Sequence, residues 1–454
     1  MSERTGVQVP EELEAAVAGG SVETVLVVVT DMQGRLQGKR VDARHFLDEV
    51  VDHATEGCSY LLAVDVDMRT VDGYAISSWA TGYGDFVLRP DLATLRPVPW
   101  QERTMLCHAD VLWGDGTPVE QSPRRILQRQ QARLAEKGWT ALAGTELEFI
   151  VFDNTYEDAW HRGYRDLTPA NTYNVDYSIL GTSRVEPLLG RIRREMRQAG
   201  MPVESLKGEC NLGQHEIAFR FGEVVAKADE HVLYKTGAKE IAAQEGRSIT
   251  FMSKFDQREG NSCHVHLSLR DASGQPLFVG DRRHGVSELL EHWLAGMLAT
   301  LADFTMLLAP NVNSYKRFVD GSFAPTTIAW GHDNRTCAFR LVGHGPSLRV
   351  ECRVPGGDVN PYLVLAALLA GGLHGVEHCL ELGPEETGNA YASSAPRVPH
   401  TLRDAAAGFE ASEVVRTALG DDVVDHYANM ARVELEAFDA AVTDWERYRC
   451  FERL

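Results

Sequence analysis

Polar and apolar residues alternate with a period of two along four short segments of the chain. In residues 141–152, Glu146 and Glu148 fall on one side, and Leu147 and Phe149 fall on the other. Three more segments repeat the pattern, with polar positions at His264, His266 and Ser268 (263–269), at Arg349, Glu351 and Arg353 (348–354), and at Glu216 and Arg220 (216–221). Successive side chains of a β-strand point to opposite faces, so each segment predicts a strand with one polar face.

The first hundred residues have a different pattern and predict a small domain of their own. Residues 22–30 are apolar and β-branched, which predicts a strand, and residues 31–38 predict a turn. Three prolines between residues 89 and 100 favour an extended connection. We therefore expect an α+β protein, with a sheet domain at residues 20–105 and a larger α/β domain at residues 106–454.

Two helices stand out in the larger domain. Ser122 and Pro123 suit the N-cap and the first position of a helix that ends near Gly138. The apolar run at residues 362–373 is too short to span a bilayer and contains two glycines. This run predicts a buried helix.

Charge and cysteine content exclude several classes of protein. The net charge is −20 and no basic stripe or tail is present, which argues against nucleic acid and anionic membranes as partners. Eight scattered cysteines without a CxxC pair favour a reduced, cytoplasmic protein. The first 17 residues carry acidic groups where a signal peptide needs basic ones.

The polar faces of the predicted strands carry Glu, His and Arg, whereas exposed strands favour Thr, Lys and Ser. Any single strand of this kind is explained by ordinary solvent exposure, but four in one chain favour a polar cavity. Carboxylates with imidazole and without thiolates suit Mg²⁺ or Mn²⁺, and neighbouring arginines suit phosphate or carboxylate groups. Such equipment is typical of phosphoryl transfer, although no Walker-type loop is present.

Seven motifs in this order resemble the glutamine synthetase family, type I, over nearly the whole chain. They are GTELEFIVF (144–152), GECNLGQHEIAFRF (208–221), EGNSCHVHLS (259–268), NSYKRFV (313–319), DNRTCAFR (333–340), RVECRVP (349–355) and NPYLVLAALLAG (360–371). The resemblance implies an N-terminal β-grasp domain, a catalytic domain, and a homo-oligomer of stacked rings, expected to be a dodecamer, with active sites between neighbouring subunits.

The resemblance also assigns site residues and cofactors, with two or more Mg²⁺ or Mn²⁺ ions per site and ATP as co-substrate. The expected metal ligands are Glu148, Glu209 and Glu216 near glutamate, and Glu146, His264 and Glu351 near the ATP phosphates. The expected substrate-binding residues are Gly260, Arg317, Arg353 and Phe323, and the expected ATP-binding residues are Phe221, His266, Ser268, Arg335, Arg340 and Arg349. Glu209, Arg335 and Arg317 are the expected catalytic residues. His266 and Phe221 also suit plain core positions.

The implied reaction joins the γ-carboxylate of L-glutamate to an amine. Transfer of a phosphoryl group from ATP gives a γ-glutamyl phosphate, whose phosphate is a competent leaving group. The amine then attacks the carbonyl, and a nearby base accepts its proton. Exclusion of water protects the acyl phosphate from hydrolysis.

Three departures from the family concern the amine. Phe323 stands where the ammonia-using enzymes have a glutamate, Tyr74 and Ala75 replace the serines after Asp72-Gly73, and Lys207-Gly208 replaces two histidines before Glu209. These changes resemble the γ-glutamylamide branch, the ethanolamide and polyamine synthetases. We expect a small primary amine, with ethanolamine favoured, in amine utilisation and nitrogen metabolism; ammonia and polyamines remain the alternatives.

Two other classes remain open at this point. A non-catalytic relative would have lost metal ligands, and a carboxylate kinase would release ADP without forming an amide. Tyr391 lies where some bacterial glutamine synthetases are modified, but its context, GNAYASSAP, differs from the regulated form.

Overall fold

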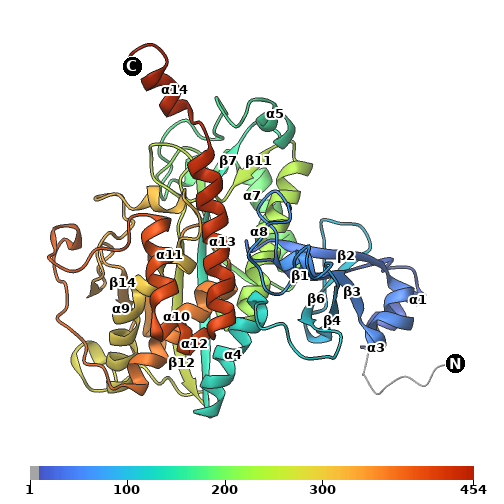
Figure 1. Cartoon of the computed structure of the whole chain (residues 1–454), viewed down its shortest axis with the longest axis horizontal. Coiled ribbons are helices and arrows are strands. Elements are labelled where there is room, and N and C mark those ends of the chain that lie inside the picture. Colours follow the sequence, from blue (N-terminus) through green and yellow to red (C-terminus); the bar gives the residue numbers. More distant parts are fainter. Residues whose placement is uncertain (1–9) are drawn as a thin grey trace.

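The computed structural model describes residues 10–454, which form two sheets with most of the helices packed around the second (Figure 1). The first sheet has the strand order β2-β1-β6-β4-β3, and β5 pairs with β6. Its strands are β1 (Thr24–Thr30), β2 (Leu36–Asp42), β3 (Thr55–Cys58), β4 (Asp85–Pro90), β5 (Arg96–Pro97) and β6 (Thr104–Leu112). The short helices α1 (Glu11–Ala18), α2 (Ala43–His45) and α3 (Val51–His53) accompany this sheet. The strand predicted at residues 22–30 is β1.

Strand β6 crosses the predicted domain boundary. It lies at the centre of the first sheet, parallel to β1 and antiparallel to β4. A boundary after residue 105 would cut this strand, so the first sheet continues to Leu112. Pro90 is the last residue of β4, Pro97 is the last residue of the two-residue strand β5, and Pro99 lies in the connection to β6. These positions suit proline, which cannot donate to a sheet ladder and favours strand ends and turns.

The second sheet has the order β13-β14-β15-β12-β7-β9-β8, and β10 and β11 pair with β7. Its strands are β7 (Trp139–Phe152), β8 (Val203–Gly208), β9 (Gln214–Phe219), β10 (Gly222–Glu223), β11 (Ser248–Thr250), β12 (Cys263–Asp271), β13 (Trp330–His332), β14 (Phe339–Val342) and β15 (Arg349–Cys352). The four strands predicted from the alternation are therefore present as β7, β9, β12 and β15. The β13–β14 pair is parallel, and the pairs along the rest of this order are antiparallel.

The apolar face of this sheet is covered by helices. Val265, Leu147 and Val350 are buried in one core with residues of α8 and α10. The helices are α4 (Pro123–Glu136), α5 (Tyr156–His161), α6 (Ile179–Ser183), α7 (Glu186–Gln198), α8 (Val224–Gln244), α9 (Glu288–Leu308), α10 (Pro361–Glu377), α11 (Leu402–Ala411), α12 (Glu413–Leu419), α13 (Asp421–Ala440) and α14 (Asp444–Cys450). Both predicted helices are present, as α4 and α10, and α10 is buried as expected. Among residues 10–454, no helix has the length and apolar character needed to cross a membrane.

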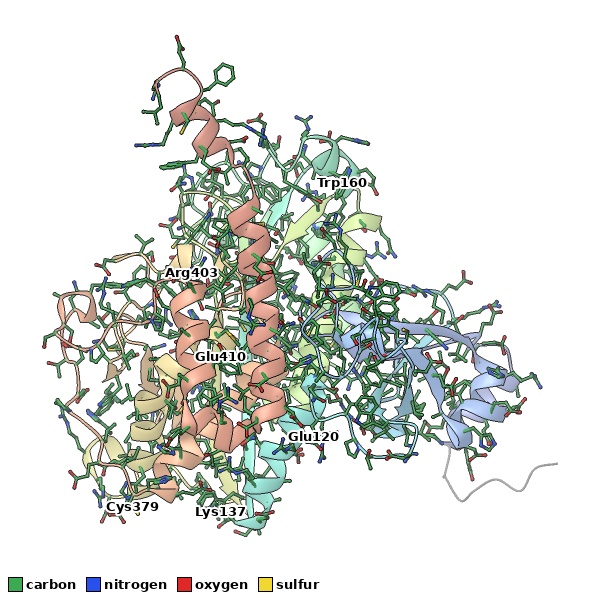
Figure 2. The ribbon with its side chains drawn as sticks, viewed as in Figure 1. Glu120, Lys137, Trp160, Cys379, Arg403 and Glu410 are labelled. Atoms are coloured by element: carbon green, nitrogen blue, oxygen red, sulfur yellow. The ribbon has the colours of Figure 1, made fainter. Side chains whose placement is uncertain are left out.

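Charged side chains cover the outer helices, as Arg403 and Glu410 do on α11 (Figure 2). At the far end of the chain, α14 projects from the body (Figure 1). Its neighbourhood exposes aromatic side chains, with Tyr448 82% and Phe451 93% accessible.

An ionic cluster around the buried Arg124 side chain connects the region of the first sheet with the helices that pack on the second. The Arg124 guanidinium donates from Nε to Asp229 Oδ1 (3.1 Å) and from Nη1 to Asp110 Oδ1 (2.6 Å). It also donates from Nη2 to Asp91 Oδ2 (2.7 Å), and Tyr362 donates its hydroxyl to Asp229 (2.5 Å). Because Asp91 and Asp110 belong to the first sheet's region, this one arginine connects that region to α4, α8 and α10.

Candidate active site

The pairing of the strands brings the predicted polar side chains next to one another on the polar face of the second sheet. Glu148 lies directly opposite Glu216, and Glu146 lies directly opposite His264. On the other side of β12, His266 lies opposite Glu351. Cross-strand partners share a face and stand about 4.5–5.5 Å apart at Cβ, so these side chains meet.

The first cluster consists of Glu148, Glu209 and Glu216. Each offers a carboxylate oxygen, and these oxygens lie within 4.8 Å of one another. Glu148 is held in place, because its Oε2 accepts the Ser262 backbone N–H (2.7 Å) and the Gln214 side-chain amide (3.1 Å). Burial and the nearby carboxylates raise the pKa of Glu216 to about 8. Three crowded carboxylates of this kind call for a cation.

The second cluster consists of Glu146, His264 and Glu351, with His266 beside them. His264 Nδ1 lies 3.3 Å from Glu146 Oε2 and 3.7 Å from Glu351 Oε1, and His266 Nε2 lies 2.9 Å from Glu146 Oε1. Burial opposes ionisation of Glu351, but the Arg353 guanidinium and the histidines lower its pKa to about 2. Burial lowers the pKa of His264, so the imidazole is neutral and able to donate a lone pair.

Both clusters fit divalent ions that prefer oxygen and imidazole ligands. The donor sets contain no thiolate, which suits Mg²⁺ or Mn²⁺ better than zinc. His264 Nε2 is buried and, within the described part of the chain, has no hydrogen-bond partner. Such an atom is costly to bury unless a ligand engages it. Glu148, Glu209 and Glu216 come together as the predicted set, whereas Glu146 comes within the same distances of His266 and Glu351, and of Glu216 and His264. The assignment of individual ligands stays a prediction.

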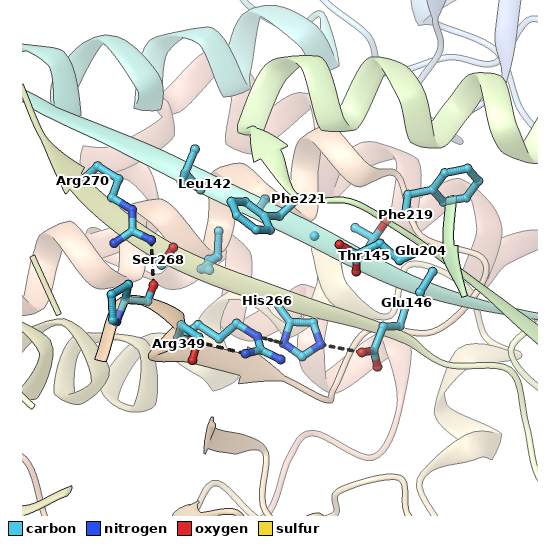
Figure 3. A pocket seen from close by; sticks show the side chains of 16 residues that line it. Leu142, Thr145, Glu146, Glu204, Phe219, Phe221, His266, Ser268, Arg270 and Arg349 are labelled. Atoms are coloured by element: carbon cyan, nitrogen blue, oxygen red, sulfur yellow. Dashed lines mark hydrogen bonds and ion pairs between the residues drawn. The ribbon is translucent and has the colours of Figure 1, made fainter. Parts of the chain in front are cut away.

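A cavity of about 260 Å³ opens beside the second cluster (Figure 3). Four of the predicted ATP-binding residues line it, namely Phe221, His266, Ser268 and Arg349. His266 lies between Arg349, whose Nε donates to its Nδ1 (3.1 Å), and Glu146 (Figure 3). Phe221 is 54% exposed at the cavity wall, which disfavours a plain core position. Glu204 and Arg270 also line the cavity, and no pattern in the sequence had marked them.

A second cavity, of about 230 Å³, lies on the other side of Glu146. The predicted residues that line it are Glu146, Glu148, Glu209, Glu216, Gly260, His264, Phe323, Arg335, Arg340, Glu351 and Arg353. Arg335 and Arg340 thus face this cavity and not the first one. Gly260 is required by close packing, because an added Cβ would stand 2.1 Å from the Ser253 carbonyl oxygen.

The structure does not bring Arg317 into either cavity. Its side chain is buried, and its guanidinium donates to the carbonyl oxygens of Val354 (2.8 Å) and Arg353 (2.9 Å). A third bond reaches the Ser262 hydroxyl (3.0 Å). Arg317 therefore holds the backbone next to Arg353 and Ser262, both of which line the second cavity.

Asp176, Tyr177 and Lys207 line the second cavity and were missed as site residues. Asp176 and Tyr177 lie on an irregular segment between α5 and α6, where no periodicity marks function. Gly208 allows this segment to approach, because an added Cβ there would stand 2.2 Å from the Val175 carbonyl oxygen. The sequence marked Lys207-Gly208 as a departure from the family. Its contact with the segment that contains Asp176 and Tyr177 arises only in the folded structure.

Asp72 and Tyr74 do not line either of these two cavities. The Asp72 carbonyl accepts a bond from the Asn429 side chain (3.0 Å), and Tyr74 is buried with its ring 4.7 Å from that of His426. In the position of an expected serine, Tyr74 is therefore a core residue.

Comparison with known proteins identifies the family. The family model for the glutamine synthetase catalytic domain matches residues 120–450. The chain belongs to the glutamine synthetase family. It is 62% identical over 454 residues to a gamma-glutamylethanolamide synthetase from Streptomyces coelicolor, covering 100% of this chain and 98% of that one. It is 36% identical over 435 residues to a glutamate–isopropylamine ligase from a Pseudomonas species, covering 94% and 95% of the two chains.

A solved structure, described as a GmaS/ADP complex, has the same fold. It superposes with a TM-score of 0.85 at 29% identity, and the match covers 97% of this chain and 99% of that one. The resemblance stated from the motifs is thus confirmed, including its amine-ligase branch.

Metal binding is expected to depend on pH through Glu216. In the metal-free protein this carboxyl keeps its proton up to about pH 8, so a bound ion has to displace that proton. The affinity for Mn²⁺ should rise about tenfold per pH unit from pH 6 to pH 8 and level off above. Calorimetric titration in two buffers of different ionisation enthalpy measures the proton released, and an affinity that is constant from pH 6 to pH 9 would contradict this.

Proposed function

We propose that this protein is an ATP-dependent ligase that joins the γ-carboxylate of L-glutamate to a small primary amine, with ethanolamine favoured. The observation that carries the proposal is that two cavities meet at Glu146, and that the carboxylates and imidazoles of both clusters border this meeting point. One cavity accepts the nucleotide, and the other accepts glutamate and the amine. A phosphoryl group then passes between them without leaving the site.

Different arginines bind the carboxylate of glutamate and the transferred phosphate. Arg353, in the second cavity, suits a glutamate carboxylate, and Arg335 and Arg340 suit the transferred phosphate. Bound Mg²⁺ or Mn²⁺ ions supply charge neutralisation on the phosphates. In this arrangement Arg317 acts by positioning the backbone of Arg353.

The amine attacks the γ-glutamyl phosphate in the second cavity. Glu209 borders this space, and in this proposal it accepts the amine's proton. Phe323 is 55% exposed at the cavity and offers an apolar wall to an alkyl chain. Each methylene buried there contributes about 0.8 kcal/mol. The relatives named as ligases of ethanolamine and isopropylamine support an alkylamine over ammonia.

The remaining expectations belong to the same proposal. The N-terminal sheet is the β-grasp domain of the family, and the protein works in the cytoplasm as a ring-shaped homo-oligomer, a dodecamer. The exposed aromatic residues around α14 support an assembly that covers them. A ring neighbour would then bring its Asp72 region to the amine side of the site.

An amine panel tests the proposal. With glutamate, ATP and Mg²⁺ present, ethanolamine should stimulate ADP release more than putrescine or ammonium at equal concentration, and a γ-glutamylamide should accumulate. Mass spectrometry of the product and an ADP-release assay measure both. Faster turnover with ammonium than with ethanolamine would indicate that the protein is a glutamine synthetase. ADP release without an amide product would indicate a carboxylate kinase.

A further inference from the structure

Lys207 places a protein ammonium group inside the cavity proposed for the amine. It lies on β8 opposite Glu216, and its Nζ forms ion pairs with Glu209 and with Glu216, the latter at 3.6 Å. The same Nζ stands 5.2 Å from the centre of the Tyr177 ring. Carboxylates on one side and an aromatic face on the other are the surroundings that bind a small cation.

The charges of this cluster show what the lysine changes. Glu148, Glu209 and Glu216 carry three negative charges when ionised, and Lys207 reduces the net charge to −2. One divalent ion then neutralises the cluster completely. Without the lysine, the same cluster with its ion would keep one negative charge, which would attract a further monovalent cation.

We propose that Lys207 is a specificity-determining residue whose ammonium group occupies the cation position beside Glu209 and Tyr177 and thereby excludes ammonium ion as a substrate. The inference rests on the proposed function and deepens it. An ammonium ion is held by charge alone, and Lys207 already supplies a cation beside Glu209 and Glu216. A substrate must therefore gain its binding from elsewhere.

An alkylamine has that other source. Its carbon chain contacts the apolar surfaces of Phe323 and Tyr177, which line the same cavity as Lys207. This contact does not depend on an unneutralised carboxylate, so the lysine discriminates against ammonium more strongly than against ethanolamine. Gly208 contributes indirectly, because it lets the segment that carries Tyr177 reach the lysine.

The test compares kcat/KM for ammonium and for ethanolamine in the wild-type protein, Lys207→Gln and Lys207→Arg. Lys207→Gln should raise the ammonium-to-ethanolamine ratio at least about tenfold, since it restores one unit of negative charge. Lys207→Arg keeps the charge and should retain the wild-type ratio. Lys137→Gln is the matched control, because that lysine pairs with Glu377 (3.7 Å) and lines neither of the two cavities.

A binding measurement covers a variant that folds but does not turn over. With Mn²⁺ and ADP present, ammonium chloride should raise the melting temperature of Lys207→Gln more than sodium chloride does, and should not do so in the wild type. An unchanged substrate ratio in an active Lys207→Gln, or no ammonium-specific shift in an inactive one, overturns the role of Lys207. A wild-type protein that ligates no amine overturns the proposed function instead, whereas normal ethanolamine ligation with an unchanged ratio overturns this inference alone.

Discussion

Glu148→Gln should reduce turnover by on the order of a hundred- to a thousand-fold while leaving the fold intact. Glutamine has nearly the same shape and its carbonyl can still accept the Ser262 N–H, but the cluster loses one charge and one anionic ligand. His264→Ala should have a similar effect through the second cluster. ADP release measures turnover, and manganese titration measures how many ions bind.

Glu377→Gln is the control for this change. Glu377 forms ion pairs on the surface with Arg133 (3.0 Å) and Lys137 (3.7 Å), and exposed pairs of this kind contribute little. Its turnover should therefore match the wild type. Near-normal turnover in both Glu148→Gln and His264→Ala would remove the assignment of two metal clusters.

Arg124→Leu should lower the free energy of unfolding by about 3–5 kcal/mol. The change leaves the buried Asp229 carboxylate without its principal cation, and it removes the bonds to Asp91 and Asp110 that join the first sheet to α4. Thermal and urea unfolding, followed by circular dichroism, measure the loss.

The neighbouring residue of the same helix provides the comparison. Arg125 pairs with Glu120 at 3.0 Å, but both side chains are more than one-third exposed. Arg125→Leu should therefore change the stability by about 1 kcal/mol or less. Equal losses of unfolding free energy in the two variants would show that the buried cluster stabilises the protein no more than an exposed ion pair does. Partial recovery in Arg124→Leu combined with Asp229→Asn would identify the unpaired carboxylate as the cause.

Much of the second sheet could be predicted from the sequence, because alternation at a period of two is a local property. Glu146 and Glu148 fall on one face whichever strands pair with theirs, so the strand that the structure contains as β7 could be predicted. The position where the first sheet ends could not be predicted from the sequence. The three prolines gave a clear local signal, yet whether β6 pairs with β1 depends on contacts between residues about eighty positions apart.

The site divides in the same way. The sequence by itself determined the residue types of the two carboxylate-containing clusters, the family, and the departures at Phe323 and Lys207, because each can be read from spacing and motif. Only the tertiary structure decided that Arg317 is buried beneath the cavity, since its partners are backbone carbonyls that no side-chain pattern reveals. It also decided that Tyr177 faces Lys207. That contact depends on a segment thirty residues away packing against a glycine, and such packing is set by the folded chain as a whole.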